Sequence, residues 1–260
     1  MRSTIATIFL GLSLVAGCEV GSTGGGGGGG DDTGGGGVDA AVSQTPKLDV
    51  MVDKSAISTE LGSTSMITVS LTASGGFSGA VALSATVVDA TDVPLSGWTV
   101  VFNSPSVNLA ANGTGSAVAT LTIPTLNAGL AGSVKLKAMS SLGAQNFVST
   151  VTVLNQVTMS VTQNAAQQCV YPTTGTMMVK AGTKVRFMNK FTQDAITIHS
   201  NGGGQGVAHE PDPGHAINTV YERTFAGTGT FDWYCHAPGP NLDRRQQGGT
   251  NDNPKFTVVP

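Results

Sequence analysis

The chain has 260 residues, a formal net charge of −3 and few charged side chains, which make up 11% of the composition. It shows no basic patch, so a nucleic-acid partner is not expected. It contains three cysteines, four histidines and 36 glycines; all four histidines lie within residues 199–236, and the longest glycine runs lie within residues 24–37.

The first residues predict export. Residues 5–15 form an apolar run that ends in small residues, and it is too short to span a bilayer, which is typical of a signal peptide. Residues 15–18 (VAGC) resemble a bacterial lipobox. The resemblance implies a signal peptide over residues 1–17 and a lipidated Cys18, which would anchor the protein to a membrane of the bacterial cell envelope, on its periplasmic or cell-surface side. The alternative is an ordinary secretory signal with a chance cysteine.

Residues 18–45 predict a disordered tether, because their long glycine runs cannot bury apolar surface. They do not predict a phosphate-binding loop, since no strand precedes them and no Gly-Lys-Ser/Thr closes them.

Residues 46–155 predict a β-sandwich. Short runs in which apolar residues alternate with Ser and Thr are divided by Gly, Pro and Asn, and this spacing is typical of a sandwich. Examples are residues 66–71, 80–87, 117–123 and 147–153. The segment resembles bacterial immunoglobulin-like domains at residues 75–83, 98–105 and 112–114, which implies a spacer or adhesion module.

Residues 156–260 predict a second sandwich. The expected strands are at 157–161, 177–179, 184–189, 195–199, 221–225, 230–234 and 255–259. Their number and spacing again favour a sandwich, so the predicted fold class is all-β with two sandwich domains.

This second segment is similar to the cupredoxins, the plastocyanin-like and azurin-like blue-copper proteins. The resemblance lies in residues 169–172, 180–189, 221–225, 229–235 and 256–259. It implies a Greek-key sandwich that holds one copper ion, a role in electron transfer, and a redox partner protein. Cys235 falls on the position of the family's copper cysteine.

A blue-copper centre needs one thiolate, two imidazoles and a weak axial donor. The candidate ligands are therefore His199, His209, Cys235 and His236, and His215 and Gln246 are further candidates. The pattern departs from the family at both histidines, and no Met follows Cys235 to act as the axial donor, a place that Gln246 could take. His199 lies farther along the chain than the usual first histidine, and His236 directly follows the cysteine. Adjacent residues on a strand point to opposite faces, so Cys235 and His236 can share a metal only if the chain turns between them.

Cys235 also has an alternative role. Once Cys18 is lipidated, only Cys169 and Cys235 remain, and an even count in an oxidising compartment indicates a disulfide. The two roles exclude each other. The function is thus either an exported copper-binding electron carrier or a metal-free surface lipoprotein with a Cys169–Cys235 bridge. No nucleophile elbow, HExxH motif or acid pair indicates an enzyme.

Overall fold

The computed structural model describes most of the chain beyond the predicted tether. The described residues are 44–126, 129–165, 168–171, 177–199, 207–211, 213–236 and 254–260. They form strands, turns and loops without a helix, so none of them belongs to a helix that could cross a membrane. The prediction of an all-β chain is confirmed. The predicted signal peptide, Cys18 and tether residues 18–43 lie outside the described residues.

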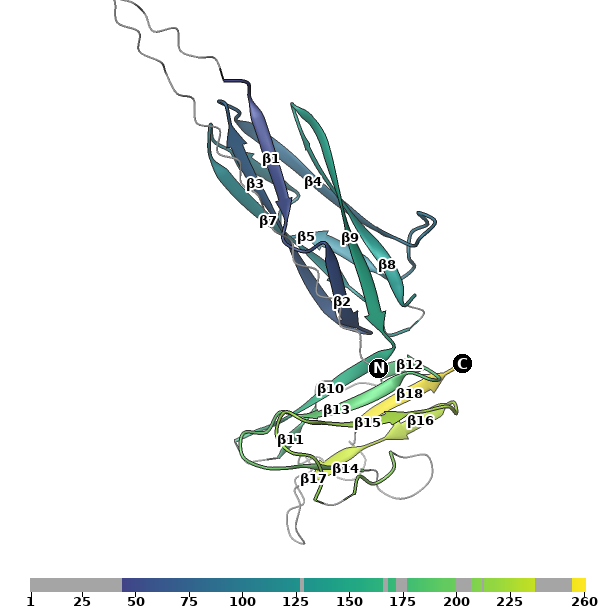
Figure 1. Cartoon of the computed structure of the whole chain (residues 1–260). Helices are drawn as coiled ribbons and strands as arrows, with labels where there is room; N and C mark the ends of the chain where they lie inside the picture. The colour runs from purple at the N-terminus through teal and green to yellow at the C-terminus, as the bar shows by residue number, and fades with distance from the viewer. Residues whose placement is uncertain are drawn as a thin grey trace, which may run out of the picture. The chain divides into compact units, whose positions relative to one another are not determined.

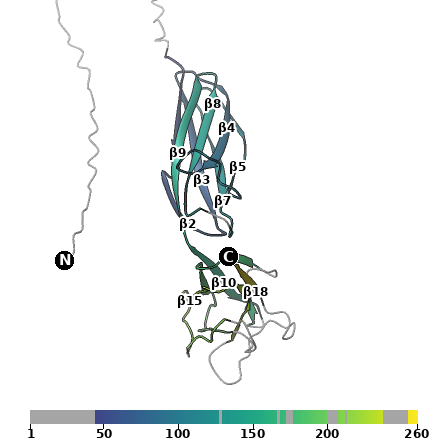
Figure 2. The same ribbon diagram turned by 90° about the vertical axis from the view of Figure 1, so that its right-hand side faces the viewer.

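Nine strands build the first sandwich (Figure 1). They are β1 (Lys47–Val52), β2 (Ala56–Glu60), β3 (Thr64–Ser74), β4 (Gly79–Val88), β5 (Thr99–Phe102), β6 (Ser106–Leu109), β7 (Thr114–Thr122), β8 (Ala131–Ser140) and β9 (Gly143–Leu154). One sheet has the order β1-β3-β7-β5, and the other has the order β2-β9-β8-β4-β6. Neighbouring strands β4, β8 and β9 lie side by side in two perpendicular views (Figure 1, Figure 2).

Alternation along the strands separates the core of this sandwich from its surface. On β3, Ile67, Val69 and Leu71 are buried, whereas Met66 and Ser70, at alternate positions of the same strand, are exposed. This is the period of two expected when one face of a strand packs on a core and the other meets water. The inner faces of both sheets enclose one cluster of buried residues drawn from positions 48–153.

Nine further strands build the second sandwich. They are β10 (Gln156–Gln163), β11 (Cys169–Val170), β12 (Met177–Lys180), β13 (Lys184–Asn189), β14 (Thr197–His199), β15 (Val220–Thr224), β16 (Gly229–Asp232), β17 (Tyr234–His236) and β18 (Lys255–Val259). Its sheets have the orders β11-β10-β13-β15 and β12-β18-β16, and β14 pairs with β17 in a two-stranded ribbon. The pairs β10–β13 and β12–β18 are parallel.

Aromatic rings fill the core of the second sandwich. Trp233 lies edge-on to Phe187 and Tyr171, each with ring centroids 4.8 Å apart. Phe231 and Phe256 stack with their centroids 5.4 Å apart. Buried aromatic pairs of this kind contribute about 0.5–1.5 kcal/mol beyond the area they bury. Trp233 directly precedes β17, and the Tyr171 hydroxyl accepts from the amide of Cys235 on β17 (3.2 Å), so this core lies against the strand that carries part of the candidate site.

Candidate metal site

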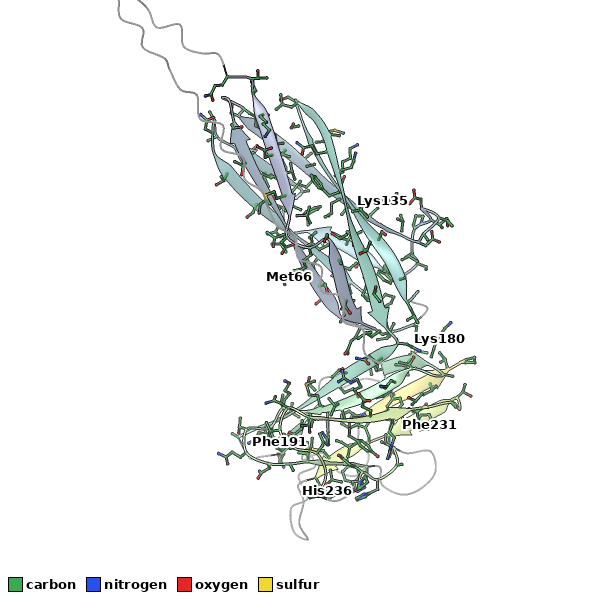
Figure 3. All side chains as sticks on the ribbon, viewed as in Figure 1. Met66, Lys135, Lys180, Phe191, Phe231 and His236 are labelled. Atoms are coloured by element: carbon green, nitrogen blue, oxygen red, sulfur yellow. A yellow bond between two sulfur atoms is a disulfide. The ribbon has the colours of Figure 1, made fainter. Side chains whose placement is uncertain are left out.

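The short ribbon of β14 and β17 brings two of the four histidines together. The strands are antiparallel, with His199 opposite Tyr234 and Thr197 opposite His236. Paired residues share a face, and so do residues two apart on one strand. His199, Tyr234 and His236 therefore lie on one face of the ribbon, and the stick view places His236 at its end (Figure 3).

A third histidine joins them from the loop that follows residue 206. The ring centroid of His199 lies 4.7 Å from that of His209 and 4.7 Å from that of His236. The centroids of His209 and His236 are 5.9 Å apart. One nitrogen from each of the three lies within 4.8 Å of the other two. Nitrogens bound about 2 Å from one metal ion are roughly 3–4 Å apart, so a shared ion would require these three nitrogens to approach one another by about 1 Å.

Backbone contacts on both sides of His209 hold its loop against the sandwich. The amide of Val207 donates to the carbonyl of Asp232 (3.2 Å), and the amide of Glu210 donates to that of Ile198 (2.9 Å). The Tyr221 hydroxyl donates to the carbonyl of Ala208 (2.9 Å). Burial raises the pKa of Tyr221 above its usual value, so this hydroxyl remains a donor at neutral pH. His209 itself is exposed, which leaves the cluster accessible from solvent.

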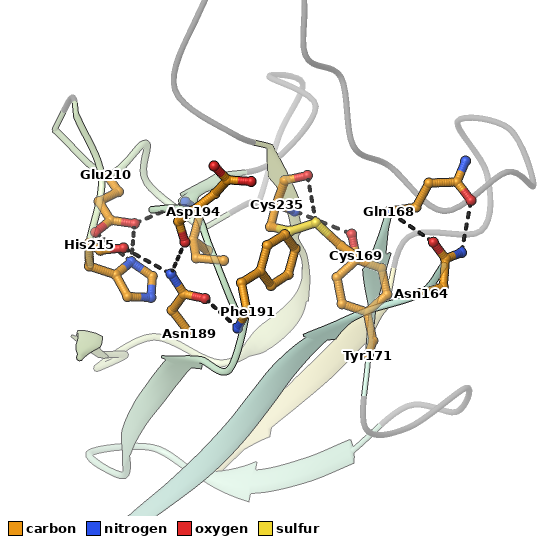
Figure 4. Close-up of a disulfide and its surroundings, with 11 residues drawn as sticks. Asn164, Gln168, Cys169, Tyr171, Asn189, Phe191, Asp194, Glu210, His215 and Cys235 are labelled. Carbon is orange, nitrogen blue, oxygen red and sulfur yellow. Dashed lines mark hydrogen bonds and ion pairs between the residues drawn. A yellow bond between two sulfur atoms is a disulfide. The ribbon is translucent and has the colours of Figure 1, made fainter. Parts of the chain in front are cut away.

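Cys235 is bonded to Cys169 (Figure 4). Their Cα atoms are 6.3 Å apart, within the usual range for a disulfide, and both side chains are fully buried. The prediction of Cys235 as a metal ligand is wrong for this structure, because a disulfide sulfur is not a thiolate. Strand alternation also turns its side chain into the core, away from His236. The alternative that sequence analysis left open, the Cys169–Cys235 bridge, is the one found.

The two further candidate ligands do not join the cluster in the described part of the chain. His215 is buried, and its Nδ1 lies 2.8 Å from both carboxylate oxygens of Glu210. It is not one of the three histidines that could share an ion. Gln246 lies outside the described residues. Sequence reasoning missed Glu210, whose only signal is its place directly after His209.

Comparisons with known proteins add no function to this site. No protein-family model matches the chain, and neither does any curated protein. A family 123 glycoside hydrolase from Clostridium perfringens is 12% identical with a TM-score of 0.35, and the match covers 44% of this chain and 30% of that chain. Domains 4 and 5 of the S-layer protein SbsC are 18% identical (TM-score 0.30; 42% and 54% covered), and a chimeric titin Z1Z2 is 17% identical (TM-score 0.27; 84% and 98% covered). The match thus spans about a third of the hydrolase chain and about half of the S-layer chain, and likenesses this weak carry no functional argument.

Proposed function

We propose that this chain is an exported, membrane-anchored protein that binds one copper ion through His199, His209 and His236. The observation that carries the proposal is the convergence of three imidazoles from separate segments, with one nitrogen each within 4.8 Å of the others. Imidazole ligands suit both copper and zinc, and divalent copper binds a given set of such donors most tightly among the first-row metals. His199 and His236 lie on paired strands, and hydrogen bonds hold the loop of His209 against the sandwich. The three side chains are therefore positioned before a metal ion binds, as a metal site requires.

Several features of the chain support its placement in the cell envelope. Residues 1–17 read as a signal peptide, residues 15–18 resemble a lipobox, and a glycine-rich tether follows. The disulfide between Cys169 and Cys235 is typical of exported proteins, because cytosolic thiols are kept reduced. In this proposal the lipid on Cys18 attaches the protein to a membrane, and the tether gives the sandwiches room to move.

The proposed site binds copper, but its ligands differ from the Cys and His ligands of a blue-copper centre. The sequence of the second sandwich resembles the cupredoxins at residues 180–189 and 229–235, but Cys235 is used in the disulfide. Three imidazoles form an open site that lacks the thiolate on which blue-copper electron transfer depends. Electron transfer through a Cys235 thiolate is therefore not part of the proposal.

One observation favours a second candidate, a metal-free structural or binding lipoprotein. Cys235, at the position of the copper-binding cysteine of cupredoxins, instead forms a disulfide with Cys169. In that case the three histidines form only a polar surface group, and the protein would act through its sandwich faces.

Calorimetric titration distinguishes the two candidates. The full chain is titrated with Cu(II) and separately with Zn(II), next to a variant in which His199, His209 and His236 are all replaced by Ala. The copper proposal predicts one Cu(II) per chain, tighter binding of Cu(II) than of Zn(II), and no specific binding by the triple variant. Equal heats from the wild type and the triple variant would establish the metal-free candidate.

A further inference from the structure

A buried carboxylate lies directly behind the histidine cluster. Glu210 follows His209 in the chain, yet it is only 4% exposed. Its amide donates to the carbonyl of Ile198 (2.9 Å), and its Oε2 accepts from the amide of Ile198 (3.0 Å). Ile198 directly precedes His199. Glu210 therefore hydrogen-bonds to both the amide and the carbonyl of Ile198, the residue before His199. It also directly follows His209, so it contacts the chain next to two candidate ligands.

The same carboxylate holds the turn that leads away from the cluster (Figure 4). Both of its oxygens lie 2.8 Å from Nδ1 of His215. His215 exchanges two backbone hydrogen bonds with Ile196, of 2.9 and 3.1 Å, and its carbonyl accepts from the Asn189 side chain (3.1 Å). The segment from Glu210 to His215 is thus fastened to the chain around β14 at both of its ends.

We propose that Glu210 is the positioning residue of the metal site, and this inference depends on the proposed function. Pairing of β14 with β17 sets the spacing between His199 and His236, but His209 comes from an exposed loop position. The contacts of Glu210 with Ile198 fix His209 relative to His199. A ligand fixed before the metal arrives loses little conformational freedom on binding, and this raises the affinity.

The chemistry of the position argues against simple space filling. A buried carboxylate is costly unless it is paired and hydrogen-bonded, and two buried polar partners can often be replaced together by apolar residues of similar volume without loss of stability. Glu210 makes hydrogen bonds to two partners that lie in different segments, Ile198 and His215. We therefore expect the main contribution of Glu210 to be the distance that it sets between His209 and His199.

Variants of Glu210 in the full chain test the inference with two readouts. The first is hydrogen–deuterium exchange of the peptides that cover Ile198 and residues 207–211 in the metal-free protein, and the second is the Kd for Cu(II). Glu210→Leu removes both side-chain contacts. Glu210→Gln can keep them, because its amide oxygen can accept from the Ile198 amide and its amide nitrogen can donate to Nδ1 of His215 in the tautomer that carries the proton on Nε2. Glu222→Gln on β15 is the matched control, since its carboxylate contacts Lys184 and Arg186.

We expect Glu210→Leu to speed exchange in both peptides and to raise the Kd about 10–100-fold, the usual cost of losing an outer-shell partner. Glu210→Gln should stay within a few-fold of the wild type, and Glu222→Gln should match it. If Glu210→Leu does not fold, as judged by loss of cooperative unfolding, Glu210→Asp replaces it, because the shorter side chain cannot reach both partners. Asp is expected to raise the Kd at least about tenfold.

A wild-type Kd in the Leu or Asp variant would overturn the inference, and so would unchanged exchange in both peptides. A Gln variant as weak as the Leu variant would overturn its hydrogen-bond basis. A wild type that binds no Cu(II) at all would instead remove the proposed function. The exchange comparison would still decide whether Glu210 holds the His209 loop, so the two failures are distinguishable.

Discussion

Cys235 and His236 are neighbours in the chain, but their side chains serve opposite faces of β17. The sulfur of Cys235 is bonded to Cys169 in the fully buried core, whereas the ring of His236 lies 4.7 Å from that of His199 on the other face. The disulfide fixes the strand from the inside, and the histidine joins the candidate site on the outside. One strand thus contributes both a disulfide cysteine and a candidate metal ligand.

The disulfide should be intact in the isolated protein and should stabilise it strongly. Under denaturing, non-reducing conditions, alkylation followed by peptide mapping should leave Cys169 and Cys235 unmodified. Replacing both by Ser should lower the free energy of unfolding by about 4 kcal/mol, because the bridge closes a loop with a sequence separation of 66. Urea denaturation measures the loss. Alkylation of both cysteines in unreduced protein would contradict the bridge.

Removing the exposed ligand alone should impair metal binding with little effect on folding. His209→Ala is expected to raise the Kd for Cu(II) by more than about tenfold, because loss of an outer-shell contact alone typically costs that much. An exposed side chain contributes little to stability, so the free energy of unfolding, measured by urea denaturation, should change by less than about 0.5 kcal/mol. Lys255→Ala, an exposed position on β18, is the control. Equal affinities in His209→Ala and in the control would exclude His209 as a ligand.

Gly214 should be intolerant of a side chain. It has a φ of +79°, a conformation that costs other residues about 1–3 kcal/mol. A Cβ at this position would also collide with the carbonyl oxygen of Ile196 and approach the Thr197 hydroxyl oxygen to 2.6 Å. Gly214→Ala should therefore destabilise the protein by at least about 2 kcal/mol and weaken Cu(II) binding, because the chain beside β14 must shift.

Gly227→Ala is the matched control for this substitution. A Cβ added at Gly227 meets nothing within 4 Å. Thermal unfolding of the two variants provides the measurement, and equal midpoints would contradict the close packing of residue 214 against β14.

The ion pairs of Glu222 should give the second sandwich a small acid-dependent stability. A hydrogen bond from Lys184, with a further contribution from Arg186, holds the pKa of Glu222 below its ordinary value of 4.5. A lowered folded-state pKa means that the stabilisation is present above pH 4.5 and is lost as pH falls through the folded-state pKa. Because Glu222 is 36% exposed, Glu222→Gln should cost less than about 1 kcal/mol at pH 7. Urea titrations at pH 7 and pH 3 should show the difference disappearing at the lower pH, and an equal difference at both would contradict it.

Local alternation explains why the strands were predictable. The predicted run at residues 66–71 lies within β3, and the run at residues 184–189 coincides with β13. Both depend on a period of two that sequence carries directly. The same rule separates Cys235 from His236, and it correctly indicated that the two could not easily share a metal.

The position of the third candidate ligand, His209, and the contacts that hold it could not be predicted from the sequence. His209 was a candidate by residue type alone, because its place near His199 depends on hydrogen bonds between segments, such as those of Glu210 with Ile198. No periodicity encodes such contacts. The choice between thiolate and disulfide at Cys235 likewise depended on whether β11 brings Cys169 within bonding range, a question of tertiary structure.

The most direct test of the account is a combined absorption and electron paramagnetic resonance titration of the full chain with Cu(II). Three imidazole ligands without a thiolate predict one bound Cu(II) per chain, nitrogen hyperfine structure in the spectrum, and no intense band near about 600 nm, where a copper thiolate absorbs. The nitrogen signal should be lost in the variant that lacks His199, His209 and His236. Absence of a specific Cu(II) signal, or a strong band near 600 nm, would contradict the three-histidine site.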